Sequence, residues 1–144
     1  MRTLLMTALA ALTSPALATP SCPLSTVKGT YAFEGEYTAR GGDVRCTMIG
    51  YITFDGKGTS SQSGATTREL SLKCNVSDSV RLAQTLTGTY TFDRSSCTAT
   101  VVSTESGSKT RGVFAGSGNT FLGMQVSENA DDPTSTFALR GYKQ

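Results

Sequence analysis

The 144-residue sequence contains no histidine and no tryptophan. Without histidine the chain cannot form a Ser-His-Asp or Cys-His nucleophile system, and it lacks the commonest zinc ligand. Without tryptophan, a sugar or biotin site lined by indole rings is disfavoured. These two absences remove several familiar enzyme classes before any motif is considered.

The chain also lacks a block of like charges and a long apolar run. It has 13 Lys and Arg against 11 Asp and Glu, a net charge of +2. No basic cluster points to nucleic acid or to an anionic membrane as a partner. No segment holds the roughly 20 apolar residues that a membrane-spanning helix needs, so no membrane insertion is predicted after processing.

The first residues have the features of a signal peptide. Arg2 is followed by an apolar run over residues 4–12, then by Pro15 and by the Ala-x-Ala pattern that ends at Ala18. We expect cleavage after Ala18, which makes residues 1–18 the signal peptide and residues 19–144 a single domain, secreted or periplasmic. The alternatives are an N-terminal membrane anchor and a buried core helix.

Four cysteines remain after processing, at positions 22, 46, 74 and 97, and no two of them form a C-x-x-C pair. An even number of cysteines in an exported chain predicts two disulfides, for which three pairings exist. The spacing disfavours a structural metal site, and neither a metal nor another cofactor is predicted.

The mature chain is rich in Thr, Ser, Gly and β-branched residues, and its apolar residues recur at every second position. Tyr31, Phe33 and Tyr37 share one parity, as do Ile52 and Phe54. A period of two is typical of strands. We therefore expect eight strands, at residues 29–38, 45–55, 58–70, 84–93, 96–104, 109–115, 120–127 and 135–143.

Turn residues separate these segments. Asp55-Gly56-Lys57-Gly58 is typical of a tight hairpin, because glycine supplies the positive φ that such turns need. The stretch from Asn75 to Ala83 is the one place where a short helix is expected. Asn75 or Ser77 would cap that helix, with Val80 and Leu82 on its buried side.

Short strands joined by sequential turns favour an all-β fold, a single antiparallel up-and-down β-barrel of about eight strands. Closing the barrel removes the exposed edges that an open sheet would have to protect. The alternative is a two-sheet β-sandwich. Sandwiches usually need long crossovers, and here only the link at about residues 71–83 is long.

In such a barrel the strand order decides which cysteines share a rim. Cys46 begins the second strand and Cys74 follows the third, both at one rim. Cys22 precedes the first strand and Cys97 begins the fifth, both at the other rim. Disulfide partners need Cα atoms within about 7 Å of each other. The barrel therefore predicts the pairs Cys22–Cys97 and Cys46–Cys74.

Two stretches resemble hairpins of a known group of proteins. Residues 86–101 read Leu-Thr-Gly-Thr-Tyr-Thr-Phe-Asp-Arg-Ser-Ser-Cys-Thr-Ala-Thr-Val, and residues 51–58 read Tyr-Ile-Thr-Phe-Asp-Gly-Lys-Gly. Both are similar to hairpins of small exported bacterial proteins that resemble calycin-like or allene-oxide-cyclase-like β-barrels. The resemblance covers the mature chain in layout and these two stretches in sequence. It implies a barrel with an apolar interior, and it assigns no catalytic residue.

An eight-stranded barrel either fills its interior with side chains or holds one small ligand. If it holds a ligand, the aromatic and Met side chains of the inward parity line the site. These are Tyr31, Phe33, Phe54, Tyr90, Phe92, Phe114, Met124 and Phe137. The alternative is that the same residues form a close-packed core.

The charged residues are expected outside the barrel. Glu34 and Glu36 lie two residues apart and would form an acid–base pair if they faced inward. The aromatic residues of the same strand have the opposite parity, however, and that parity is expected to face the interior. Arg140 falls on the outer parity of its strand for the same reason. The others expected on the surface are Arg45, Arg68, Glu69 and Arg111. No catalytic residue is predicted.

The sequence thus favours an exported, disulfide-stapled barrel that is not an enzyme and binds a small apolar ligand. One alternative is a secreted interaction module, an inhibitor or effector, acting through the rim loop at Ala39–Asp43 or at Asn129–Pro133. Another is a cyclase-like barrel enzyme, which a buried Glu or Arg in an open cavity would favour.

Overall fold

The structure is a computed structural model that describes residues 21–76, 80–126 and 136–144. The predicted signal peptide and its cleavage site lie outside the described residues, as does the predicted rim loop at Asn129–Pro133. No helix within the described ranges is long and apolar enough to span a membrane.

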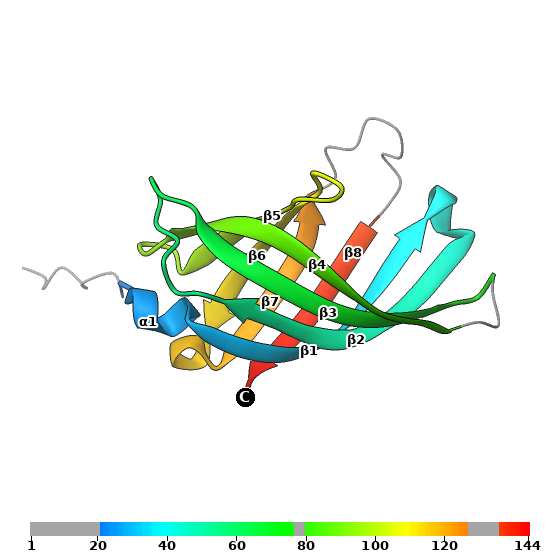
Figure 1. Ribbon diagram of the computed structural model, residues 1–144, viewed down its shortest axis with the longest axis horizontal. Coiled ribbons are helices and arrows are strands. Elements are labelled where there is room, and N and C mark those ends of the chain that lie inside the picture. The colour runs from blue at the N-terminus through cyan, green and yellow to red at the C-terminus, as the bar shows by residue number, and fades with distance from the viewer. Residues whose placement is uncertain (1–20, 77–79, 127–135) are drawn as a thin grey trace, which may run out of the picture.

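Eight antiparallel strands follow one another around a closed barrel, and the last strand pairs with the first (Figure 1). A short helix, α1 (Leu24–Val27), precedes them, and the 3-10 turns η1 (Arg40–Gly42) and η2 (Gly116–Gly118) follow β1 and β6. The up-and-down barrel is therefore confirmed, and the sandwich is excluded. The strands are β1 (Gly29–Ala39), β2 (Val44–Phe54), β3 (Gly64–Cys74), β4 (Val80–Asp93), β5 (Thr98–Ser103), β6 (Lys109–Ala115), β7 (Thr120–Val126) and β8 (Thr136–Lys143).

The helix expected over Asn75–Ala83 is not formed. Asn75 and Val76 make a turn, residues 77–79 lie outside the described ranges, and the chain from Val80 onward belongs to β4. Val80 and Leu82 are two residues apart, a spacing that places two residues on the same face of a strand but on nearly opposite sides of a helix. The prediction of a helix here was wrong because this spacing is a strand pattern and not a helical one.

The third strand was expected at residues 58–70, directly after a tight turn at Asp55–Gly58, and this was also wrong. Strand β3 begins at Gly64, so residues 55–63 form a longer connection. The Asp55 carboxylate organises it by accepting hydrogen bonds from the backbone N–H groups of Lys57 (2.9 Å) and Ala65 (3.0 Å). Residues 60–63 are polar and exposed, so no apolar face ties them to the barrel wall.

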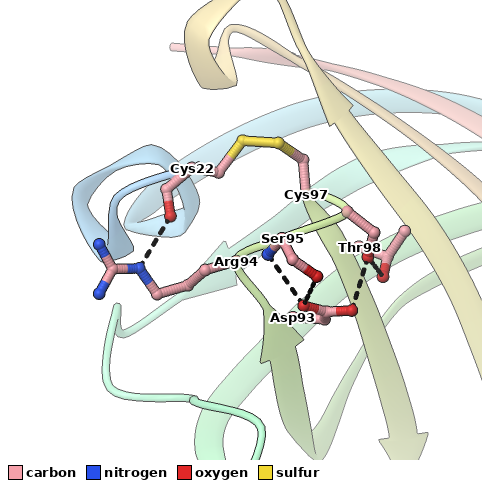
Figure 2. The surroundings of a disulfide bond; sticks show 7 residues. Cys22, Asp93, Arg94, Ser95, Cys97 and Thr98 are labelled. Carbon is pink, nitrogen blue, oxygen red and sulfur yellow. Dashed lines mark hydrogen bonds between the residues drawn. A yellow bond between two sulfur atoms is a disulfide. The ribbon is translucent and has the colours of Figure 1, made fainter. Parts of the chain in front are cut away.

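The two disulfides join the predicted cysteines, Cys22–Cys97 and Cys46–Cys74. Figure 2 shows the first, which ties the segment before α1 to the turn between β4 and β5. Two hydrogen bonds reinforce this link: the Cys22 N–H donates to the carbonyl of Arg94 (2.9 Å), and the Arg94 Nε–H donates to the carbonyl of Cys22 (3.1 Å). The helix is thereby held across one end of the barrel (Figure 1).

Aromatic rings fill the half of the barrel interior next to α1, which we call the packed half. Phe54 makes edge-to-face contacts with Tyr31 (5.8 Å between ring centroids) and Tyr90 (5.0 Å), and Phe92 makes one with Phe114 (5.8 Å). Each such pair contributes about 0.5–1.5 kcal/mol beyond its buried area. The rings therefore form a close-packed core at this end.

One aromatic member of that core was not predicted from the sequence: Phe121 of β7, which is completely buried. Two glycines make room for its ring. A Cβ atom at Gly112 would lie 2.2 Å from Phe121 Cε2, and one at Gly123 would lie 3.1 Å from Cε1. Among the side chains of β7 that the structure describes, those of the Phe121 and Gly123 parity therefore face the interior.

The hydroxyl of Tyr31 links the helix α1 to the barrel. It is buried and lies within hydrogen-bonding distance of two carbonyl oxygens, those of Thr26 in α1 (2.9 Å) and of Gly118 in η2 (2.8 Å). Burial, with a smaller contribution from Tyr90, raises the pKa of Tyr31 to about 12. The hydroxyl therefore remains a donor across the ordinary pH range.

Replacing Tyr31 with Phe removes this donor and leaves two buried carbonyls without it. We expect the free energy of unfolding to fall by about 1–3 kcal/mol, the cost of an unsatisfied buried polar group. Urea denaturation measures it. Tyr142→Phe, at an exposed position on β8, is the matched control and should change stability little. Equal effects of the two variants would contradict the assignment.

The two disulfides should stabilise the fold unequally. Cys22–Cys97 closes a sequence separation of 75 residues and Cys46–Cys74 one of 28. The loop-entropy relation makes the first more stabilising by about 1 kcal/mol. Urea denaturation of the double variants Cys22→Ser/Cys97→Ser and Cys46→Ser/Cys74→Ser tests the order, and a reversed order would contradict it.

Candidate functional site

The half of the interior away from α1, which we call the cavity half, is not filled. Its side chains enclose a cavity of about 140 Å³. The apolar lining comes from five strands and consists of Phe33, Met48, Leu70, Leu86 and Phe137. The polar lining consists of Arg68, Ser103, Thr110 and two serines of the β5–β6 turn, Ser106 and Ser108. Ser106 is exposed, so the cavity reaches the surface at that turn.

Arg68 was expected on the surface, and the structure corrects this. Side chains alternate across a strand, and in β3 the parity that contains the buried Gly64 and Thr66 also contains Arg68 and Leu70. The Arg68 side chain is therefore partly buried and lines the cavity. The expected strand ended at residue 70, which left Leu72 out of the pattern. With Leu72 included, the apolar parity of β3 would have placed Arg68 inside.

Arg68 brings a positive charge into a mainly apolar space. Burial lowers its pKa, and the negative charge of Glu105 partly offsets that effect. A guanidinium nevertheless stays protonated at neutral pH. No hydrogen bond or ion pair joins Arg68 to another side chain that the structure describes. Within the described part of the chain, no hydrogen bond thus occupies the N–H donors of this cation.

Glu105, in the turn after β5, is held at the rim by three hydrogen bonds. Its carboxylate accepts from the Thr87 N–H (2.7 Å), the Thr87 hydroxyl (3.1 Å) and the Ser103 hydroxyl (2.9 Å). These bonds, led by the one from the Thr87 backbone, lower the pKa of Glu105 to about 2. Glu105 is therefore a fixed anion whose oxygens are already occupied.

The eight residues predicted to line a ligand site fall into three groups. Only Phe33 and Phe137 line the cavity. Met124 lies on the outer face of β7 with 66% of its surface exposed, so its expected inward orientation was wrong. One set of alternating residues in β7 is apolar in the sequence: Leu122, Met124 and Val126. In the structure the other alternating set, which includes Phe121 and Gly123, faces the interior. The other five form the packed core: Tyr31, Phe54, Tyr90, Phe92 and Phe114.

The other charged residues that were expected on the surface are exposed there, as strand alternation predicted. Glu34, Glu36 and Arg140 are exposed on the outer face of β1 and β8, so the two glutamates form no acid–base pair inside the barrel. The other expected surface residues, Arg45, Glu69 and Arg111, are exposed as well. No group of three metal-ligating side chains occurs in the described parts of the chain.

The rim loop at Ala39–Asp43 contains η1 and is held by Asn75. The Asn75 side chain accepts a hydrogen bond from the Arg45 N–H (2.9 Å) and donates one to the carbonyl of Asp43 (3.0 Å). A hollow of about 740 Å³ lies beside this loop, lined in part by Tyr37, Arg45 and Asn75. It is larger than the barrel cavity but consists mostly of exposed side chains.

In comparisons with known proteins, no family model and no curated protein matches this chain. The closed eight-stranded barrel agrees with the architecture that the calycin-like resemblance implies. Membership of that group remains a prediction.

Glu105 makes the stability of the protein depend on pH. Its pKa is lower in the folded state than its ordinary value of 4.5, so its stabilising effect is complete above about pH 5 and disappears as the pH falls toward about 2. We expect Glu105→Gln to be less stable than the wild type at neutral pH, with a gap that closes over this range.

Thermal unfolding at a series of pH values measures that gap. Glu69→Gln, at an exposed position on the outer face of β3, is the matched control. A gap for Glu105→Gln that stays constant down to pH 2 would refute the role given to this carboxylate.

Proposed function

We propose that this protein is exported and that its barrel binds a small, largely apolar ligand in the cavity half. The signal-peptide pattern over residues 1–18 and the two disulfides support export, because disulfides form and persist in oxidising compartments. A relationship to calycin-like or allene-oxide-cyclase-like barrels is part of the same proposal.

The binding proposal rests on one observation: the two halves of the barrel interior differ in how closely their side chains are packed. The packed half holds interlocking aromatic rings, whereas the cavity half holds about 140 Å³ of space with an apolar lining. Protein interiors are close-packed, and empty space in them costs stability. A cavity that reaches the surface beside Ser106 is the form a ligand site takes.

The lining supports binding better than catalysis. Among the described residues that line the cavity, Arg68 is the one with a charge, and none of them is a carboxylate. A guanidinium binds anions but does not exchange a proton near neutral pH, so it does not act as a general acid or base. Arg68 in the cavity is the feature expected of a cyclase-like enzyme, but no second titratable group lines the cavity among the described residues.

The second candidate function is an interaction module that acts through the rim loop at Ala39–Asp43. The hydrogen bonds from Asn75 favour it, because a loop that is already ordered loses less conformational entropy when it binds a partner. The hollow beside the loop would accept a protruding side chain.

A cavity-filling substitution tests the first proposal. We expect fluorobenzene, a neutral probe small enough for the cavity, to bind the wild-type protein and to bind Leu86→Trp at least about tenfold more weakly, because the indole fills the space. Fluorine NMR titration measures both affinities, and the exposed Leu122→Trp on β7 is the matched control.

Circular dichroism establishes that each variant is folded before the comparison. If fluorobenzene binds folded Leu86→Trp as well as it binds the wild type, or if neither fluorobenzene nor a charged analogue of the same ring binds the wild-type protein, the cavity is not a ligand site. The rim loop is unchanged in Leu86→Trp, so loss of binding in this variant separates the first candidate from the second.

A further inference from the structure

The charge of Arg68 narrows the class of ligand. A buried charge is normally paired, because removing it from water is costly unless an opposite charge or hydrogen-bond acceptors replace the water. In the part of the chain that the structure describes, Glu105 is the carboxylate whose charge Arg68 senses. Yet Glu105 is bound to Thr87 and Ser103 and forms no ion pair with Arg68. Among the described residues, the guanidinium thus has no anion in direct contact.

The rest of the cavity sets the other requirement. Phe33, Leu86 and Phe137 present apolar surface to the same space that Arg68 enters. An inorganic anion would leave this surface uncovered, and a neutral hydrocarbon would leave the guanidinium without a partner. The occupant that satisfies both has an anionic group at one end and an apolar body at the other.

The volume limits the size of that body. A cavity of about 150 Å³ accommodates a molecule the size of benzene, and this one measures about 140 Å³. A long acyl chain does not fit within the described lining. A single ring, or an aliphatic chain of similar volume, does.

We infer that the cavity half binds a small monocarboxylate, whose carboxylate pairs with the guanidinium of Arg68 and whose body of about six to eight carbon atoms packs against Phe33 and Phe137. A carboxylate is planar and matches the fork of N–H donors of a guanidinium in a two-bond pair. This inference rests on the proposed function, since it names the ligand class of the same site.

Glu105 has a defined part in this arrangement. Its fixed negative charge at the rim weakens the attraction of the cavity for anions without competing for contact with Arg68. Its removal should therefore strengthen the binding of an anionic ligand and leave a neutral one unaffected. The Glu105→Gln variant distinguishes binding by charge from binding by shape.

The test compares three probes that differ in their polar end. Fluorobenzene, para-fluorobenzamide and para-fluorobenzoate share one ring, and the last two are nearly isosteric but differ in charge. Fluorine NMR titrations use the protein purified after export, with both disulfides formed. We expect the benzoate to bind at least about tenfold more tightly than the benzamide, and Glu105→Gln to tighten benzoate binding a few-fold.

Two arginine variants complete the design. Arg68→Met should remove the preference for benzoate while retaining fluorobenzene binding, because methionine keeps most of the apolar stem. Arg111→Met, at an exposed position on the outer face of β6, should leave all three affinities unchanged. If Arg68→Met fails to fold, the monocarboxylate inference is still tested by the ratio of the benzoate affinity to the benzamide affinity in the wild type, and by the change of that ratio in Glu105→Gln.

The outcomes distinguish the monocarboxylate inference from the proposal of an apolar ligand site. Fluorobenzene binding with equal affinities for benzoate and benzamide, or a benzoate preference that survives in Arg68→Met, would overturn the monocarboxylate inference and leave the apolar site standing. Failure of all three probes to bind the wild-type protein would overturn both. Tight benzoate binding that depends on Arg68 supports both.

Discussion

The width of an eight-stranded barrel is the constraint on which the rest of this structure depends. Strand number fixes the interior at a size that side chains just fill, and alternation sends every second residue into it. Where the inward residues are Tyr31, Phe54 and Phe114, their rings interlock and no space remains. Where the inward residues are smaller or, like Arg68, extended, the same width leaves a hollow. Close packing and open space are thus separated along the axis of the barrel.

The two ends of the barrel are built differently, in keeping with that division. At the packed end, α1 is fastened by a disulfide, by the Tyr31 hydroxyl and by the paired bonds between Cys22 and Arg94. At the cavity end, Cys46–Cys74 joins two neighbouring strands without crossing the opening. The covalent links therefore close one end and leave access to the other.

The sequence predicted the parts of this arrangement that depend on period and chain order. Strand alternation gave the barrel, and the order of strands along the chain gave both cysteine pairs. Alternation failed where both faces of a strand carry apolar residues: in β7, Leu122 and Met124 competed with Phe121, and only the glycines that accommodate the Phe121 ring settle the choice. Arg68 was misplaced because a charged residue is usually exposed, a tendency that the register of β3 overrides.

The pairing of β1 with β8 has a consequence for how the chain reaches its native state. Tyr31 aligns with Lys143, so the seam that completes the cylinder joins the two ends of the domain. Contacts so distant in the chain make for slow folding. Until the last strand arrives, β1 and β7 are open edges ready to pair with another molecule. The newly made polypeptide must therefore be kept apart from its neighbours until its C-terminal residues are available, and a chain that ends before β8 would be a source of aggregates.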